Sequence, residues 1–181
     1  PDAAMENTTH LFMAVRFNCN KCHDHPFERW TQNQYYELAA YFADVGRRAL
    51  PNGDEFVFTN ASPEAVINPS TNQAAAPKFP FSHPGTVDAN AHRREQLSQW
   101  LTAKENPYFA RSIVNRYWSY FLGRGIIDPV DDIRASNPAS NSELLDALTK
   151  DFTDNGYDLK VIAAVEKANE YQKNVIFNKI E

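Results

Sequence analysis

Apolar residues recur at helical spacing in the first third of the chain, and local start and stop signals divide this pattern into two helices. The pattern predicts a first helix over about residues 8–17. The residues expected to face its core are Leu11, Phe12, Ala14 and Val15. Thr31 and Gln34 form a T-x-x-Q capping box that opens a second helix, which we expect to end at Gly46. The residues expected to be buried on the second helix are Leu38, Phe42 and Val45.

Between about residues 50 and 90 the helical pattern stops and turn-forming residues take over. The prolines of this stretch are Pro51, Pro63, Pro69, Pro77, Pro80 and Pro84. Together with Asn52-Gly53 they predict a loop-rich connector. Within it, "EFVFT" (55–59) has the composition of a short strand, and "AVIN" (65–68) is its expected partner.

Helical spacing returns after the connector. The segment "REQLSQWLTA" (94–103) predicts one amphipathic helix. Asn106 is then expected to cap a helix that begins at Pro107, a residue favoured at the first helical position. Gly123 or Gly125 is the expected terminator of that helix.

Two further helices are predicted towards the C-terminus. Ser140 and Glu143 form a second capping box, and Gly156 closes the helix that follows it. Asp158 is expected to cap a last helix that starts with "LKVIAAV". The chain is therefore predicted to be mainly α, with two helical parts joined by a loop-rich, proline-rich connector that contains at most a short hairpin. The expected division is a C-x-x-C-H segment at 1–48, the connector at 49–92 and a helical domain at 93–181.

Composition and charge exclude several classes of protein. With 43% apolar and 23% charged residues, the 181-residue chain is typical of a globular protein that can bury a sizeable core. A net charge of −5 argues against a nucleic-acid surface, which needs a concentrated basic field. No apolar run approaches the length of a membrane span. Aromatic residues are abundant near the start, and those of the first 42 positions are Phe12, Phe17, Phe27, Trp30, Tyr35, Tyr36, Tyr41 and Phe42.

Both cysteines of the chain lie in one short motif, "CNKCH", at residues 19–23. C-x-x-C-H is the spacing that attaches a c-type haem, in which Cys19 and Cys22 would bond to the porphyrin and His23 would ligate the iron. The same segment could instead form a redox dithiol, a disulfide or a zinc corner with Cys19, Cys22 and His25 as three of four ligands. A dithiol oxidoreductase fits poorly, because its C-x-x-C follows a strand of a βαβ unit and here a helix is expected.

Covalent haem explains the two cysteines, the adjacent His23 and the local surplus of aromatic residues together. Phe and Tyr rings suit the walls of a large flat apolar group, although the same rings could form an ordinary helix core. His25 lies too close to His23 to reach the opposite face of a haem. It would contact the haem or its propionates, or it is simply a histidine fixed in a turn by Pro26.

The second axial ligand of the iron is less clearly marked. His83, in "FPFSHPG", is the first candidate, because the connector is long enough to fold back over the haem. Met13 on the first helix is the second candidate, with His10 on the same face, and an open site is the third alternative. His92 is expected to be a solvated cap of the next helix.

An acidic turn, "GRGIIDPVDDIRASNP", follows the most aromatic helix. Its carboxylates Asp128, Asp131 and Asp132 could bind calcium or act as acid and base on a sugar. The alternative is a structural network in which Arg124 and Arg134 pair with these carboxylates and fix a loop between helices.

Two long stretches resemble known families. Residues 11–43, which contain "CNKCHDHPF", resemble the signature of a planctomycete-type cytochrome-c-like domain of uncharacterised function. Residues 97–152, which contain "GRGIIDPVDD", resemble the companion domain that follows it in large exported bacterial proteins. The family's C-x-x-C-H maps onto Cys19, Cys22 and His23. The resemblance implies an extracytoplasmic protein, with other domains of a larger protein among its possible partners.

The function expected from these observations is extracytoplasmic electron transfer by a c-type cytochrome-like protein with one covalent haem. Its partner would be a redox protein, and an electron carrier is favoured over a catalyst. One alternative is a non-redox scaffold with a zinc or disulfide Cys/His corner. The other is a peroxidase-like haem enzyme with an open distal site.

Overall fold

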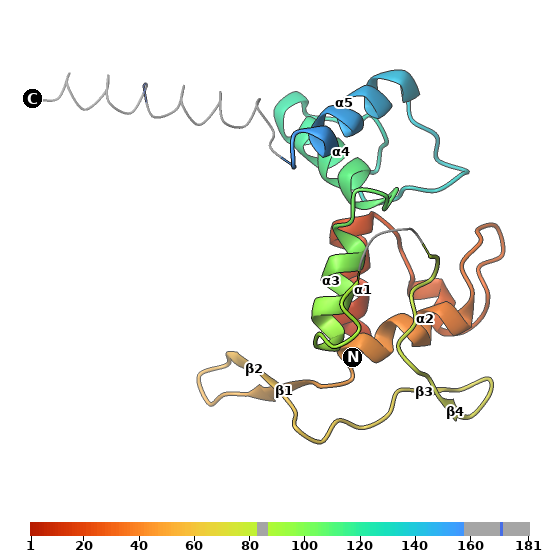
Figure 1. The fold of residues 1–181 in the computed structure, drawn as a ribbon, viewed down its shortest axis with the longest axis vertical. Coiled ribbons are helices and arrows are strands. Elements are labelled where there is room, and N and C mark those ends of the chain that lie inside the picture. Colours follow the sequence, from red (N-terminus) through yellow and green to blue (C-terminus); the bar gives the residue numbers. More distant parts are fainter. Residues whose placement is uncertain (83–86, 158–170, 172–181) are drawn as a thin grey trace, which may run out of the picture.

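The computed structural model describes residues 1–82, 87–157 and 171 (Figure 1). Its helices are α1 (Asp2–Met13), α2 (Gln32–Ala39), α3 (Arg93–Leu101), α4 (Phe109–Leu122) and α5 (Ser142–Asp154), with short 3₁₀ turns η1 (Asn18–Lys21) and η2 (Ala40–Phe42). Its strands are β1 (Val45–Ala49), β2 (Glu55–Thr59), β3 (Ile67–Asn68) and β4 (Gln73–Ala74). The strands form two antiparallel pairs, β1–β2 and β3–β4. The last predicted helix, from Asp158, lies outside the described residues.

The prediction of a mainly α fold is wrong, because the described residues combine five α-helices with two small antiparallel sheets in a mixed α and β fold. The second helix ends at Ala39 and not at Gly46, and the chain enters β1 at Val45. Gly46 lies in that strand beneath the ring of Phe58. A Cβ added at Gly46 would lie 2.5 Å from Cζ of Phe58, so glycine here makes room for the ring and does not end a helix.

The strand "EFVFT" exists as β2, but its partner differs from the prediction. It pairs with β1, whereas "AVIN" contributes β3, which pairs with β4. The β1–β2 hairpin closes through a turn in which Gly53 N–H donates to Leu50 O at 3.0 Å. Pro51 suits the second position of such a turn, and Gly53 adopts a φ of 89°.

The first helix also differs from its prediction. α1 begins at Asp2, ends at Met13 and turns its face of Met5, Thr9 and Met13 into the core. Leu11 and Phe12, expected inside, are 50% and 40% exposed.

The later helix ends follow local signals closely. Gly123 ends α4 at a φ of 78°, as predicted. The predicted start is wrong, because α4 begins at Phe109 with Tyr108 as its N-cap, and Asn106 Oδ1 accepts from the N–H groups of Tyr108 and Phe109 in the turn before the helix. The cap of α5 is Asn141 and not Ser140, because Asn141 Oδ1 accepts from Leu144 N–H at 3.0 Å. The hydroxyl of Ser140 instead donates to the carbonyl of Ile126.

Two hydrophobic cores organise the molecule. The first core joins α1, α2 and α3, and it includes aromatic rings of the connector. Phe79 stacks between Tyr41 and Trp100, with ring centroids 5.2 Å apart on each side. The second core lies between α4 and α5. Figure 1 shows these two layers one above the other, with the β1–β2 hairpin projecting from the lower one.

The two cores are joined at the end of α1. The backbone carbonyl of Ala14 accepts from Ile133 N–H at 2.8 Å. Arg116 of α4 donates to the carbonyls of His10 and Leu11, both at 3.4 Å. Helix C-termini leave carbonyls without partners within the helix, and α4 supplies partners for two of them. Among the described helices, none has the length and hydropathy of a membrane span.

Candidate functional site

The C-x-x-C-H motif forms a single exposed 3₁₀ turn between α1 and α2. Cys22 N–H donates to Cys19 O at 3.3 Å, and both cysteines are exposed free thiols. Side chains three residues apart in a 3₁₀ turn lie on the same side. The turn therefore presents the two thiols to solvent together.

The two residues between the cysteines anchor the turn to the core. Asn20 is fully buried, and its Nδ2 donates to Trp30 O at 2.7 Å. The carbonyl of Lys21 accepts from Tyr36 Oη at 2.9 Å and from Gln32 Nε2 at 3.0 Å. These bonds hold the backbone of the turn from the inside, which leaves the cysteines on its outer side.

Charged groups stabilise the same arrangement. Lys21 Nζ lies 2.9 Å from a carboxylate oxygen of Asp2, and this hydrogen bond raises the pKa of the lysine. Burial raises the pKa of Tyr36, and the charge of Asp2 raises it further, with Lys21 acting in the opposite direction. The phenol therefore stays protonated at neutral pH and can donate to the Lys21 carbonyl.

His23 follows the turn and is exposed. Its Nδ1 lies 2.7 Å from the carbonyl oxygen of Asp24, a contact in which the ring nitrogen must be the donor. In the neutral imidazole this contact places the proton on Nδ1 and leaves the lone pair on Nε2. Histidines that bind metals commonly donate their other N–H to a carbonyl in this way. Asp24 is itself held in place, since its carboxylate accepts from Gln32 N–H at the start of α2.

His25 has a structural role in the turn that follows. Its Nδ1 accepts from Phe27 N–H at 3.2 Å and from Glu28 N–H at 3.0 Å. This is the alternative in which the histidine is fixed in a turn. Phe27, at the tip of this turn, is 85% exposed.

A cavity of about 230 Å³ opens beside Cys19, between the motif and the acidic turn. Its walls include Arg16, Arg134 and Glu28. One carboxylate oxygen of Glu28 is buried and has no hydrogen-bond partner among the described residues. The cavity is small and charged, which does not suit a large apolar group.

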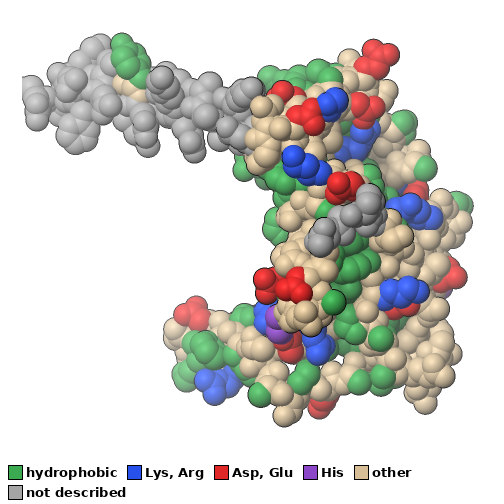
Figure 2. Space-filling view, viewed as in Figure 1, with side chains coloured by type: hydrophobic (Ala, Val, Ile, Leu, Met, Phe, Trp, Pro, Cys, Tyr) green, Lys and Arg blue, Asp and Glu red, His purple; other side chains and the backbone are tan. Residues whose placement is uncertain are grey.

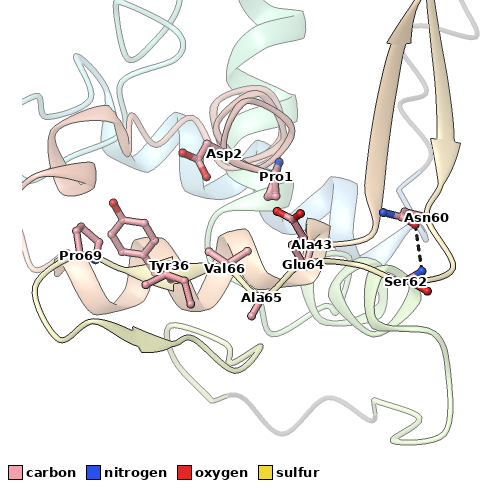
Figure 3. A pocket seen from close by; sticks show the side chains of 11 residues that line it. Pro1, Asp2, Tyr36, Ala43, Asn60, Ser62, Glu64, Ala65, Val66 and Pro69 are labelled. Atoms are coloured by element: carbon pink, nitrogen blue, oxygen red, sulfur yellow. Dashed lines mark hydrogen bonds between the residues drawn. The ribbon is translucent and has the colours of Figure 1, made fainter.

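A larger cavity, of about 530 Å³, lies on another side of the first layer. Figure 3 shows it between the start of α1, Tyr36 of α2 and the segment that follows β2. The carboxylates of Asp2 and Glu64 and the apolar side chain of Val66 line it. Neither cysteine is among its lining residues, so this cavity is separate from the motif.

Among the described residues, none of the candidate distal ligands lies beside the C-x-x-C-H motif. Met13 is 1% exposed and packs in the first core, which argues against a role on the exposed face of the turn. His83 lies outside the described residues. His10 bonds to Asp131, and His92 caps α3 and bonds to Asp44.

Most of the early aromatic residues form ordinary core. Phe17, Trp30, Tyr35, Tyr36 and Tyr41 all belong to the first hydrophobic cluster. The ring centroids of Phe17 and Trp30 lie 4.9 Å apart, and the two rings close the base of the loop that carries the motif. Core packing therefore accounts for the abundance of aromatic residues near the start of the chain. This abundance gives no independent support to a haem pocket.

The acidic turn is a network of ion pairs. Asp131 bridges two groups of the first layer, with Oδ2 at 2.5 Å from His10 Nε2 and Oδ1 at 2.6 Å from Arg16. Asp128 pairs with Arg124, and Asp132 pairs with Arg134, each at 3.2 Å. This is the arrangement predicted as the alternative to a calcium or sugar site.

The pKa of Asp131 reflects this position. Burial alone would raise it, but the hydrogen bond and charge of Arg16, followed by those of His10, outweigh burial and hold the pKa below its usual value. The carboxylate is thus charged throughout the neutral range, and it ties the acidic turn to α1 and the loop after it.

Sequence reasoning missed the residues that position the motif. Asn20 and Lys21 read as the two unspecified positions of C-x-x-C, yet one is fully buried and the carbonyl of the other is bonded twice. The available signal was Asn20 itself, because a small amide inside a tight turn commonly bonds to backbone. The bonds to the Lys21 carbonyl could not be predicted from the sequence, because they involve the backbone of Lys21 and not its side chain.

The motif fits covalent attachment of a haem, whereas its surroundings do not enclose one. Two open thiols on one turn and a histidine with a free, oriented Nε2 are the required donors. Among the described residues, no three His, Cys, Asp or Glu side chains group closely enough to hold a metal ion. Cys19, Cys22 and His23 therefore lie on the exposed surface of the molecule.

Comparison with known proteins found family matches for two segments of the chain. Residues 1–47 match a family described as PSCyt2, protein of unknown function (DUF1549). Residues 93–177 match a family described as PSD1, protein of unknown function (DUF1553). Both are planctomycete-type domain families, and the two matches follow one another in the order that the resemblance implies. Searches of curated proteins and of solved structures gave no match.

Proposed function

We propose that the chain carries one covalently attached haem on its C-x-x-C-H turn and passes electrons outside the cytoplasm. The observation that carries the proposal is the donor arrangement of the turn. Cys19 and Cys22 are exposed free thiols at one turn, and the bond from His23 Nδ1 to the Asp24 carbonyl leaves Nε2 of the neutral ring available for iron.

Each residue has a defined part in the proposal. Cys19 and Cys22 would form the two thioether bonds, and His23 would be the proximal ligand. The bound group would supply a one-electron iron couple whose potential depends on its axial ligands and exposure. Asn20 and the Lys21 carbonyl keep the turn rigid, so that both thiols and the imidazole hold their relative positions. His83 remains the first candidate for the distal ligand, with Met13 disfavoured by its burial.

The open surroundings favour a carrier over an enzyme. A group attached to an exposed turn is accessible to a protein partner without any opening motion. An enzyme would need a distal cavity that selects its substrate, and the cavity beside Cys19 is only about 230 Å³. The partner would be another redox protein or another domain of a larger exported protein, as the resemblance implies.

The test is expression together with haem-maturation machinery, followed by acid–acetone extraction and an absorption spectrum. We expect the denatured wild type to retain haem and the double variant Cys19→Ala, Cys22→Ala to lose it. His23→Ala should keep the covalent bonds but change the spin state. His25→Ala is the matched control, because its ring only fixes a turn, and it should retain both the haem and the spectrum.

Other results would favour the alternatives. A colourless protein with stoichiometric zinc, or with Cys19 and Cys22 joined in a disulfide, would replace the proposal by the scaffold function. A high-spin protein that binds carbon monoxide freely, with no change on His83→Ala, would favour the peroxidase-like enzyme.

A further inference from the structure

The β1–β2 hairpin stands apart from both hydrophobic cores. Figure 1 shows it projecting from the lower layer, and every residue of β2 is exposed. Phe56, Val57 and Phe58 are 49%, 59% and 39% exposed, and Figure 2 shows apolar side chains gathered on this arm. A two-stranded hairpin is marginally stable in water by itself, and a third strand or a packing surface is normally needed.

The hydrogen bonds at the two ends of the hairpin define which backbone groups face outward. Leu50 N–H donates to Asp54 O, and Asn60 N–H donates to Asp44 O, both at 2.7 Å. Hydrogen-bonded pairs alternate along an antiparallel ladder. Glu55, Val57 and Thr59 of β2 therefore direct their N–H and C=O groups away from β1, and the sheet has no further strand among the described residues.

The two edges of the hairpin differ in charge. β1 carries Arg47 and Arg48, and basic residues on an edge oppose further pairing. If β1 paired with a second β1 in full register, Arg47 would lie opposite its own copy, which is destabilising. β2 has no basic residue and no proline, and its single charge, Glu55, lies at one end. The β2 edge is thus the one left open.

We propose that β2 pairs with β2 of a second copy of this chain, in an antiparallel arrangement centred on Val57. The outward-facing residues then match one another, since Val57 meets the partner's Val57 and Glu55 meets the partner's Thr59. Phe56 comes opposite the partner's Phe58 on the other face. No like charges are opposed, and the pairing is self-complementary, as a two-fold interface requires.

The resulting sheet has four strands in the order β1, β2, β2, β1. Its aromatic face joins the Phe56 and Phe58 of both copies, whose rings within one copy already lie 6.0 Å apart. The charges of the hairpin balance, because Arg47 and Arg48 are matched by Asp54 and Glu55. Two hairpins can therefore approach without net repulsion, although the whole chain carries a net charge of −5.

The first experiment is sedimentation of the full chain over a wide concentration range. The paired strands form a small interface, so we expect a weak, reversible dimer in the micromolar to millimolar range. Val57→Lys should raise the dissociation constant by at least about tenfold, because it opposes two lysines across the pair. Ala49→Lys adds the same charge to the exposed β1 edge and should leave the dissociation constant unchanged.

A second experiment locates the contact by cysteine cross-linking in the Cys19→Ser, Cys22→Ser chain, so that its outcome is independent of haem attachment. A directly opposed pair of this type has a Cα separation of about 5.5 Å, within reach of a disulfide. Val57→Cys should therefore form a covalent dimer on oxidation, whereas Thr59→Cys, which faces the partner's Glu55, should not. A wild type that stays monomeric at millimolar concentration, a dimer that persists in Val57→Lys, or equal cross-linking at both positions would overturn the proposal.

Discussion

Asn20 shows how a single side chain orients the exposed motif. It lies between the two cysteines, and its amide reaches inward to the carbonyl of Trp30. Because the side chain is fully buried, its loss would leave a cavity and remove one of the two donors to the Trp30 carbonyl, which also accepts from His25 N–H at 2.9 Å. The outward position of Cys19 and Cys22 therefore depends on the inward position of the residue between them.

This dependence predicts a stability loss on Asn20→Ala. We expect the free energy of unfolding to fall by about 1 kcal/mol, the typical net contribution of one hydrogen bond. Urea unfolding followed by circular dichroism measures it. Asn18→Ala is the control, since Asn18 is exposed on the same turn and should change stability by less than about 0.5 kcal/mol. Equal effects of the two substitutions would show that the buried amide does not hold the turn.

The single side chain of Asp131 makes a pH-dependent contribution to the free energy of unfolding. Asp131→Asn removes the charged contacts to His10 and Arg16, and we expect a loss of about 1–2 kcal/mol at neutral pH. The pKa of this carboxyl is lowered in the folded protein, so its contribution is present above the ordinary value of about 3.9. It disappears as the pH falls through the lower, folded pKa.

Thermal unfolding of wild type and Asp131→Asn should therefore differ at pH 7 and converge in acid. Asp128→Asn is the matched control, because its pair with Arg124 is largely exposed and should contribute less than about 0.5 kcal/mol. A constant difference between wild type and Asp131→Asn down to the acid limit would show that the ion pairs are not its cause.

At the scale of elements, local signals were predictable and long-range pairing was not. The capping box at Thr31 and the terminator Gly123 are each determined by a few neighbouring residues, and the structure confirms them. The place of Gly46 in a strand depends on its contact with Phe58, twelve positions away. The choice of the buried face of α1 depends on its contacts with α2 and α4. Strand partners and helix faces are chosen by tertiary contacts, which helical periodicity does not encode.

The candidate site follows the same division. Cys19, Cys22 and His23 form a contiguous motif, so the sequence predicts where the candidate donors lie. Asn20, Tyr36 and Gln32, which hold the turn, act through backbone carbonyls and are visible only in the fold.

The start of α2 offers a test of local capping. Thr31 Oγ1 accepts from Gln34 N–H at 3.2 Å, and Gln34 Oε1 accepts from Thr31 N–H at 2.9 Å. Thr31→Ala should lower the free energy of unfolding by about 1 kcal/mol, whereas Thr31→Ser keeps the hydroxyl and should retain most of it. Chemical denaturation of both variants gives the comparison. If Thr31→Ser were as damaging as Thr31→Ala, packing of the methyl group and not capping would be the cause.

At the scale of the whole molecule, the segments that match two different families form one packed unit. Contacts from α4 and the acidic turn complete the end of α1, through Arg116, Ile133 and Asp131. Few of these contacts could survive if one core opened alone. We therefore expect both cores to unfold together.

Hydrogen exchange measured by mass spectrometry tests this cooperativity. Peptides from α2 and from α5 should report the same opening free energy, and Arg116→Gln should lower both by similar amounts. A second core that opens at clearly lower free energy than the first would contradict the expectation.

The bond from Arg116 to His10 also has a consequence for the order of synthesis. These residues are 106 positions apart, so the carbonyls at the end of α1 emerge from the ribosome long before their partners. We expect the first hundred residues of a nascent chain to stay open to proteases around the C-x-x-C-H turn until α4 has been made. Limited proteolysis of stalled chains that end before and after Leu122 would show this change as a sudden gain of resistance, and equal resistance in both would contradict it.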